Sequence, residues 1–278
     1  MQNLIPLNKR PRICWDVMKK NKFEEMIPAE LLEGIRENGI AYIPIGSMEW
    51  HGPHMAMGMD TLNAYEVSLR ASSKTGGVVL PPTYIGTETA RDPEILKKIG
   101  FSGNESIVGM DFPKNTVKSF YWPQELFESI VRHQIEMLRD MRYRLIVLAN
   151  GHGADNQIVI LNRLAQEYSC QRFRVLPVFI LFEDGGVGIG HAGLAETAIM
   201  LRICPQGVDL GQLPARGQKL YNVDYAIVDN ESFISGSTPD FSVRYDPRDA
   251  TAETGEKLIA HAAVKCAEIV TKALRGID

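Results

Sequence analysis

The segment Arg144–Asn156, RLIVLANGHGADN, decides the fold of this chain. Its first part, Arg144–Ala149, is a short apolar run of the kind that forms a buried strand. The run leads directly into the polar cluster NGHGADN, and apolar residues at helical spacing follow over Gln157–Tyr168. A strand, a polar loop and a helix in this order predict one βα unit of a largely parallel sheet.

Similar units occur on both sides of this segment. Strand-like apolar runs are found at Ile40–Ile45, Val78–Leu80 and Phe173–Phe182. Helical patterns cover Thr61–Ser72, Pro123–Met141, Leu194–Ile203 and a C-terminal stretch whose apolar stripe is Leu258, Ile259, Ala262, Ala263, Cys266, Ile269, Val270 and Ala273. This alternation predicts an α/β fold. Two irregular regions, Gly86–Ser119 and Gly207–Pro247, are interpreted as long loops that serve as lids or subunit contacts.

The composition restricts the class of protein. A length of 278 residues is compatible with one α/β domain, so we expect a single domain over residues 1–278. The 30 basic and 34 acidic residues give a net charge of -4, which argues against nucleic acid or an anionic membrane as the main partner. Cys14, Cys170, Cys204 and Cys266 form no CxxC pair and are expected to be free thiols. With no signal-peptide pattern and no run of about 20 apolar residues, a cytoplasmic location is predicted.

Three polar clusters follow predicted strands: IPIGSMEWHGPH, VLANGHGADN and GGVGIGHAGLAE. They contain four of the six histidines, namely His51, His54, His152 and His191. The carboxyl ends of parallel strands meet at one edge of a sheet, so we expect these clusters to converge there.

The first cluster contains candidate metal ligands. Glu49 and His51 are two residues apart, which in extended backbone places both side chains on one side. Asp60 precedes a predicted helix, where its carboxylate could cap the helix or bind an ion. Imidazole and carboxylate ligands together suit Zn, Mn, Fe or Co. Each of these residues taken alone is equally compatible with a cap or an ordinary buried polar side chain.

Taken together, the clusters resemble the motifs of the creatininase (creatinine amidohydrolase) family. PIGSMEWHGPHMAMGMD is similar to its opening motif, with Gly-Ser, Glu-x-His-Gly-x-His and an Asp nine residues after the first His of that motif, while NGHG and HAGLAET resemble its second and third motifs. The resemblance extends from about Ile40 to Ile203. It implies a three-layer α/β/α sandwich, a centre of two divalent ions (Zn or Mn, with Fe as a further option) and a homo-oligomer, by resemblance a hexamer.

The resemblance also implies individual ligands. Glu49 would bind one ion and His51 the other, Asp60 would bridge them, and His152 would complete the first site. The chain departs from creatininase at Ala154, where that enzyme has a metal-binding Glu. Glu196, in HAGLAET, is preferred as the replacement ligand.

Several further residues are candidates for positions near the centre. Asp155 is the alternative fifth ligand, although a role as N-cap of the helix over Gln157–Tyr168 explains it better. His191 is predicted to be catalytic, by donating to an oxyanion or shuttling a proton. His54 is equally compatible with catalysis and with orienting a ligand, and Ser47 and Asn150 are interpreted as structural. Tyr121 and Trp122 could line a substrate pocket or belong to the core.

The predicted activity is that of a metal-dependent hydrolase. A metal-bridging hydroxide would attack the carbonyl of a small cyclic substrate, either a cyclic amide or a cyclic ketone. The segment from Glu88 to Pro123 differs from creatininase and suggests the branch that hydrolyses a carbon-carbon bond in 3-dehydro-scyllo-inosose, with Arg91 and Lys118 as hydrogen-bond donors or ordinary surface charges. The alternatives are a non-catalytic metal- or ligand-binding protein on the same fold, and a nucleotide-binding protein that uses GGVGIG, a poor match to phosphate-loop patterns.

Overall fold

Two adjacent parallel strands form the centre of the computed structural model. Every residue of β1 (Ile40–Gly46) and of β4 (Leu145–Asn150) is buried, as expected for a strand covered on both faces. They pair in register from Ile40 opposite Leu145 to Ile45 opposite Asn150. The structure describes residues 20–98, 101–113, 115, 117–181, 190–218, 220, 222–223, 226–227 and 246–277.

Three shorter or more exposed strands complete the five-stranded sheet. β2 (Val78–Val79) and β3 (Thr83–Tyr84) pair with β1, and β5 (Arg174–Phe179) pairs with β4. All of these pairings are parallel, and the main strand order is β2-β1-β4-β5. The predicted mainly parallel sheet is therefore confirmed, and the predicted strand over Phe173–Phe182 is shorter than expected.

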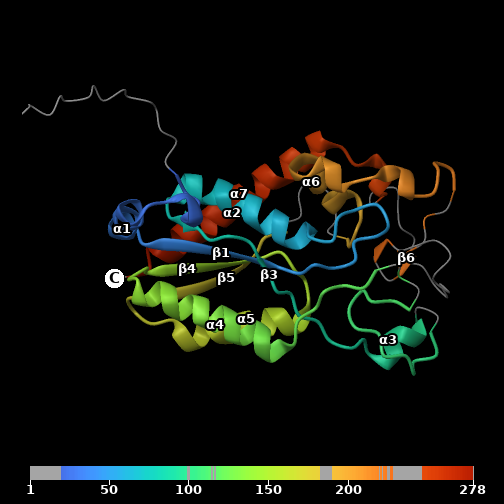
Figure 1. Cartoon of the computed structure of the whole chain (residues 1–278), viewed down its shortest axis with the longest axis horizontal. Helices are drawn as coiled ribbons and strands as arrows, with labels where there is room; N and C mark the ends of the chain where they lie inside the picture. The colour runs from blue at the N-terminus through green and yellow to red at the C-terminus, as the bar shows by residue number, and fades with distance from the viewer. Residues whose placement is uncertain are drawn as a thin grey trace, which may run out of the picture.

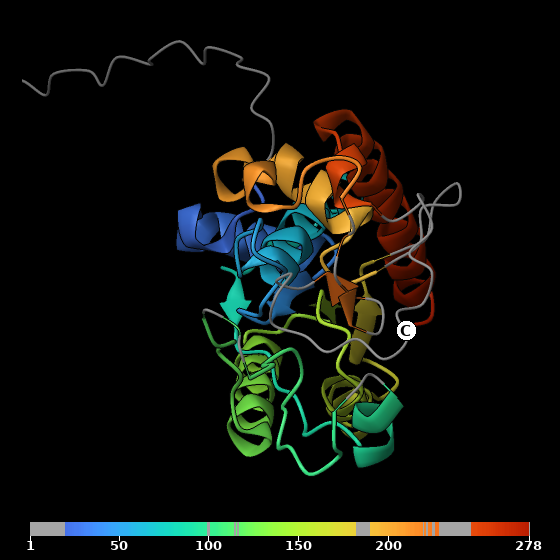
Figure 2. The same ribbon diagram turned by 90° about the vertical axis from the view of Figure 1, so that its right-hand side faces the viewer.

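Helices cover both faces of this sheet (Figures 1 and 2). One face is covered by α2 (Met59–Thr75), α6 (Leu194–Ile203) and α7 (Ala252–Leu274). The other is covered by α4 (Gln124–Asp140) and α5 (Asp155–Tyr168). This is the predicted three-layer α/β/α sandwich.

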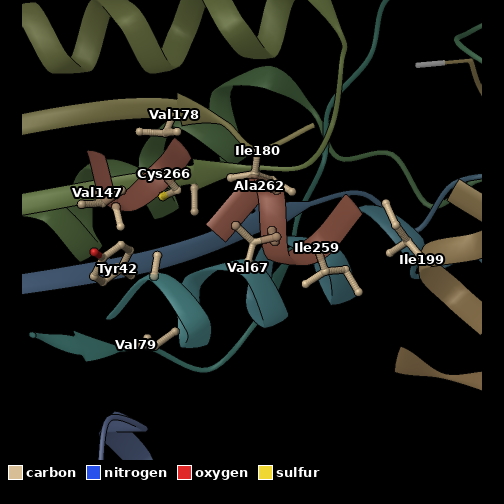
Figure 3. Close-up of a cluster of buried hydrophobic side chains, with 14 of the residues drawn as sticks. Tyr42, Val67, Val79, Val147, Val178, Ile180, Ile199, Ile259, Ala262 and Cys266 are labelled. Atoms are coloured by element: carbon tan, nitrogen blue, oxygen red, sulfur yellow. The ribbon is translucent and has the colours of Figure 1, made fainter. Parts of the chain in front are cut away.

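The alternation of side chains along the strands explains the two layers. Ile40 and Tyr42 of β1 contact the cluster that contains α2, α6 and α7, whereas Ala41 and Ile43 contact the cluster that contains α4 and α5. Figure 3 shows the first cluster, in which Tyr42 and Val147 of the strands lie near Cys266 of α7. Of the predicted stripe on α7, only Ile269 is exposed, at 37%.

The remaining elements lie at the edges of the sandwich. The region over Gly86–Ser119, expected to be entirely irregular, contains a short helix, α3 (Pro93–Lys98). Of the region Gly207–Pro247, a large part lies outside the described residues. The other elements are α1 (Pro28–Glu37), β6 (Asn222–Val223), β7 (Ala226–Ile227) and the 3-10 turns Phe23–Glu25, Pro205–Gly207, Leu210–Gln212 and Pro247–Asp249.

Two predictions about the whole chain can be compared with the described residues. Cys170, Cys204 and Cys266 are free thiols, while Cys14 lies outside this part of the chain. No helix within the described ranges is long and apolar enough to cross a membrane.

Candidate metal centre

The polar clusters after β1 and β4 meet above the carboxyl ends of the sheet. The chain leaves β4 through Gly151, which lies against the start of α2. A Cβ atom at this position would lie 2.1 Å from the carbonyl oxygen of Asp60, so no larger residue fits without moving the backbone. This close approach brings His152 beside Asp60. The predicted convergence is thereby confirmed for the clusters that follow β1 and β4.

The first group of side chains that could hold an ion consists of Glu49, Asp60 and His152. Their ligand atoms converge on the Nδ1 atom of His152, which lies 2.8 Å from Oε2 of Glu49 and 3.0 Å from Oδ2 of Asp60. All three residues are buried. Two carboxylates and one imidazole form a mixed oxygen and nitrogen donor set that suits transition metals.

The second group consists of His51, His191 and Glu196. The Nε2 atom of His51 lies 3.1 Å from Oδ1 of Asp60 and 3.8 Å from Oε2 of Glu196. The rings of His51 and His191 lie with their centroids 4.2 Å apart. Asp60 thus directs one carboxylate oxygen to each group, as a bridging ligand requires.

Each histidine of the two groups uses one ring nitrogen for a backbone carbonyl. Nδ1 of His51 donates to the carbonyl of Glu49, Nε2 of His152 to that of Thr87, and Nε2 of His191 to that of Trp50. In the neutral ring the other nitrogen then has its lone pair directed at the carboxylates. This arrangement of a ligand histidine held by a second hydrogen bond is typical of metal sites, so the residues fit a metal centre.

The electrostatics of the two groups point to the same conclusion. Burial alone would lower the pKa of His51, but the carboxylates of Asp60 and Glu196 outweigh it and raise this pKa to about 10. Burial raises the pKa of Glu196 to about 7. Burial, together with the adjacent His51, lowers the pKa of His191 to about 4. The buried carboxylates of Glu49, Asp60 and Glu196 therefore attract positive charge, which either protons or metal cations can supply.

Ser47 and Asn150 hold the candidate ligands in place, as their predicted structural role requires. The hydroxyl oxygen of Ser47 lies 2.9 Å from Oε2 of Glu49 and 2.6 Å from Oδ2 of Asp60. Oδ1 of Asn150 accepts from the backbone N–H of His152 at 3.1 Å, and its Nδ2 donates to the carbonyl of the same residue at 2.8 Å. Both side chains are buried, so these contacts restrict the loops that carry the ligands.

The structure corrects the predictions for the helix starts. Asp155 is the first residue of α5 rather than its N-cap, which is Ala154, and the Asp155 side chain is exposed. Neither possible ion-binding group contains Asp155. Asp60 likewise does not cap α2, because the N-cap is Gly58. Its carboxylate instead turns toward His51 and His152, as the second expected role, that of an ion ligand, would require.

The other predicted residues lie outside both groups. His54 is buried, and its Nε2 lies 2.9 Å from the hydroxyl of Thr197, the neighbour of Glu196, which supports an orienting role. The Tyr121 hydroxyl accepts from the backbone N–H of Met110. Trp122 packs against the core on the side of α4 and α5.

A cavity of about 130 Å³ opens onto both groups, and we call it the site cavity. Its small volume suits a substrate well below the size of drug-like ligands. Beside the ligands it is lined by Glu88, Arg91, Met110, Gly151, Gly153, Ala154, Phe179, Leu181 and Gly190. The segment from Glu88 to Pro123 therefore contributes part of the wall, as predicted, whereas Lys118 donates to the carbonyls of Asp111 and Phe112.

Sequence reasoning missed several contributors. The carbonyls of Thr87 and Trp50 orient two histidines, but a backbone carbonyl has no side-chain signature in a sequence. Glu88 was not singled out, although it lines the site cavity. Burial raises the pKa of its carboxyl group. The GGVGIG segment lies almost entirely outside the described residues.

Comparisons with known proteins identify the family of the chain. The creatininase family model, described as creatinine amidohydrolase, matches residues 24–270. The creatinine amidohydrolase of Pseudomonas putida is 27% identical over 196 residues, 63% of this chain and 68% of that protein. The mycofactocin precursor peptide peptidase of Mycolicibacterium smegmatis is 23% identical over 243 residues, 83% of each protein.

Solved structures show the same fold. A mutant creatininase of the Zn-Zn type has a TM-score of 0.63 and 21% identity, covering 92% of this chain and 99% of that one. The structure named Creatininase Mn has a TM-score of 0.61 and 20% identity, with the same coverage.

Proposed function

Because this chain belongs to the creatininase family of metal-dependent hydrolases, we propose that its reaction opens a small cyclic substrate, either a cyclic amide or a cyclic ketone. The name of the Pseudomonas putida relative gives creatinine, a cyclic amide, as its substrate, and that of the Mycolicibacterium smegmatis relative gives a peptide. The small volume of the site cavity supports a compact substrate. Cleavage of 3-dehydro-scyllo-inosose remains the narrower alternative.

The orientation of the three histidines is the observation that supports this proposal most strongly. Each directs one ring nitrogen at buried carboxylates while a backbone carbonyl holds the other nitrogen. Burying these carboxylates without cations beside them would cost free energy of folding, because carboxylates lose their hydration in the interior. A protein that only binds metal would need the ligands but not the adjoining cavity, whereas a non-catalytic ligand-binding protein would need both, so turnover has to be measured to distinguish it.

In the proposed centre, Glu49, Asp60 and His152 hold one ion, and His51, Asp60 and Glu196 hold the other. Two divalent ions, zinc or manganese by preference, would polarise the substrate carbonyl and make a water molecule more acidic. Ser47 keeps the carboxylates of Glu49 and Asp60 in their positions.

His191 is proposed as the catalytic residue. Nε2 of His191 donates to the carbonyl of Trp50, so in the neutral ring the lone pair of Nδ1 is available to accept a proton beside the site cavity, which His191 lines. This nitrogen lies 3.9 Å from Oε1 of Glu49. Because the same ring could also serve as a ligand, His191→Asn separates the roles: a catalytic role predicts parental metal content with a large loss of kcat, and lost metal would contradict it.

The test of the proposed function uses the full chain, stripped with a chelator and reconstituted with zinc or manganese. We expect turnover of at least one compound from a panel of lactams, other cyclic amides and keto-inositols, with products identified by mass spectrometry.

His51→Ala and Glu49→Gln should lose metal and activity but keep the fold, because the ligands lie on strand-end loops. His133→Ala, at an exposed position on α4, is the matched control. Unchanged activity in the ligand variants would disprove the proposed centre.

A further inference from the structure

Glu88 is an acidic residue of the site cavity that belongs to neither group of candidate metal ligands. Four acidic residues line this cavity, and the two groups together contain the other three, Glu49, Asp60 and Glu196. Glu88 follows β3, whereas the candidate ligands lie close to the ends of β1 and β4 and to the starts of α2 and α6. Its carboxylate therefore lines the cavity from a separate segment, so we looked for a role other than holding an ion.

The backbone that carries Glu88 is tied to the proposed centre. The preceding residue, Thr87, is fully buried, and its N–H donates to Oε1 of Gln157 on α5 at 3.0 Å. The carbonyl of Thr87 accepts from Nε2 of His152 at 3.2 Å. Because the same residue holds His152 and precedes Glu88, the Cα atom of Glu88 has a fixed position relative to the first ion-binding group.

The side chain of Glu88 packs against Gly109, which has a φ of +51°. A Cβ atom at Gly109 would lie 2.4 Å from Cγ of Glu88 and 2.5 Å from the hydroxyl oxygen of Tyr121, so only glycine leaves room for both side chains. Oε1 of Glu88 accepts from the backbone N–H of Thr89 at 2.7 Å. No donor among the described residues forms a hydrogen bond with Oε2. The stem of Glu88 is therefore fixed, and one of its carboxylate oxygens has no donor.

Neighbouring groups compensate the charge of Glu88 only in part. Burial raises the pKa of its carboxyl group, and the N–H of Thr89, His152 and Arg91 each oppose this rise without cancelling it. The guanidinium group of Arg91 itself donates from Nε to the carbonyl of Gly109. A further donor beside Oε2 would replace hydration that the carboxylate has lost in the protein.

We propose that Glu88 is a specificity-determining residue that accepts a hydrogen bond from an N–H group of the substrate while the carbonyl to be hydrolysed lies at the metal ligands. The inference rests on the proposed function, because it places the substrate in the same cavity. It narrows the substrate to a small cyclic amide that carries a second N–H group, as an amine or a further amide. An ionised carboxylate only accepts hydrogen bonds, and those it forms are stronger than neutral ones. Met110, Phe179 and Leu181, which also line the cavity, offer no strong partner for the several hydroxyl groups of a keto-inositol.

The test measures binding by calorimetry, separately from turnover. The zinc-loaded full chain is titrated with pairs of compounds in which an N–H or amino group replaces a methylene or methyl group: piperazin-2-one and piperidin-2-one, dihydrouracil and glutarimide, and 3-amino- and 3-methylpyrrolidin-2-one. We expect at least one N–H compound to bind the parent about 10- to 100-fold more tightly than its partner, as a charge-assisted hydrogen bond would produce. For a compound that is hydrolysed, KM is compared instead, since it equals the dissociation constant when the chemical step is slow.

Two variants of Glu88 and one control make the test decisive. Glu88→Gln keeps an oxygen for the N–H of Thr89 but loses the charge, so the preference for the N–H compound should shrink while the metal content and the affinity for its partner stay unchanged. Glu88→Met has a similar length without a strong acceptor and should abolish the preference. Glu94→Gln removes an exposed carboxylate from the neighbouring α3, where it pairs with Lys97, and should change neither affinity.

Several results would overturn the inference. One is the absence of an N–H preference in the parent for every pair. Another is a preference that keeps its full size in Glu88→Gln, which decides the test by itself if Glu88→Met disturbs the wall of the cavity. Loss of an ion from Glu88→Gln, measured by elemental analysis, would make Glu88 a metal ligand instead. Tighter binding of 3-hydroxypyrrolidin-2-one than of the 3-amino compound would show that an O–H donor is preferred.

The outcome is separable from that of the proposed function. An N–H preference that depends on Glu88 supports the inference even if none of these compounds is hydrolysed. Conversely, hydrolysis of cyclic amides with no N–H preference in binding supports the proposed reaction and refutes the role of Glu88.

Discussion

At the scale of single residues, Glu196 is the position on which the proposed second ion depends most. Its carboxylate is buried, and Oε2 accepts a hydrogen bond from the backbone N–H of Ala192 at 2.6 Å. The same oxygen lies 3.8 Å from Nε2 of His51. Since Ala154 has no ligand atom to offer, another carboxylate has to complete a two-ion centre. Glu196 is the one that the fold brings into the group with His51 and His191.

We therefore predict that Glu196→Gln loses about one equivalent of metal and most of the activity, because an amide is a far weaker donor than a carboxylate. Asp155→Asn is the matched control. Asp155 is exposed at the first position of α5, so its substitution should leave the metal content near that of the parent. Elemental analysis of both purified variants measures this. Loss of an ion from Asp155→Asn but not from Glu196→Gln would reverse the assignment.

At the scale of elements, α6 and α7 approach each other closely at Gly255. A Cβ atom at this position would lie 1.9 Å from the carbonyl oxygen of Ala198 on α6. Glu196 and Thr197 lie on the same helix, so the packing of α6 against α7 also determines where this part of the proposed centre is placed.

We predict that Gly255→Ala lowers the free energy of unfolding by about 1 to 3 kcal/mol, since the added methyl group forces two backbones apart. In an ordinary helix the same change stabilises by about 0.5 to 1 kcal/mol. Gly34→Ala in α1, where the nearest atom is 4.0 Å away, is the control and should be neutral or stabilising. Chemical denaturation of the two variants measures the difference, and equal effects would contradict the close packing.

A carboxylate on α7 also connects the three helices of this layer. Glu256 pairs with Arg70 of α2 at 2.5 Å and with Arg202 of α6 at 2.6 Å. The hydrogen bonds from Arg70, followed by the one from Arg202, lower the pKa of Glu256 to about 2. The side chain is 42% exposed, so solvent screening limits the contribution of these pairs to stability.

We predict that Glu256→Gln costs below about 1 kcal/mol of unfolding free energy at pH 7. Because the pKa is depressed in the folded state, the stabilisation is complete above the ordinary value near 4.5 and is lost as the pH falls toward 2. The difference between parent and variant should therefore shrink between pH 4.5 and pH 3 in denaturation experiments. A cost that is independent of pH would show that charge is not its origin.

At the scale of the whole molecule, the proposed centre connects the loops after β1 and β4 to α2 and α6. Ions bound there would hold these segments together only in the folded chain. Folding and metal binding are consequently linked. The predicted single domain, the cytoplasmic location and the homo-oligomer with a hexamer as its expected form stay predictions.

We predict that zinc or manganese raises the thermal midpoint of the chelator-stripped protein. At 1,000 times the dissociation constant the added stability is about 4 kcal/mol for one site. Magnesium should have a much smaller effect, because nitrogen ligands suit it poorly. Scanning calorimetry of the stripped protein, with and without each ion, measures this. His51→Ala should show a reduced shift, and a parental shift in that variant would argue that the metal binds elsewhere.

The sequence by itself determined the layers of the fold and the edge of the sheet where the site lies. Apolar runs such as Ile40–Ile45 and Arg144–Ala149 reflect burial on both faces, and helical periodicity placed α6 at its observed bounds. The motifs also identified Glu49, His51, Asp60, His152 and Glu196 as a set. These signals are readable because strand and helix periods are local properties of the chain.

Only the tertiary structure decided how this set is arranged and what surrounds it. It placed Asp60 between two histidines, left Asp155 exposed, and put Arg91 rather than Lys118 on the wall of the site cavity. The carbonyls of Thr87 and Trp50, which orient His152 and His191, could not have been identified beforehand. The physical reason is that these contacts join residues far apart in sequence, and a carbonyl group is the same in every residue.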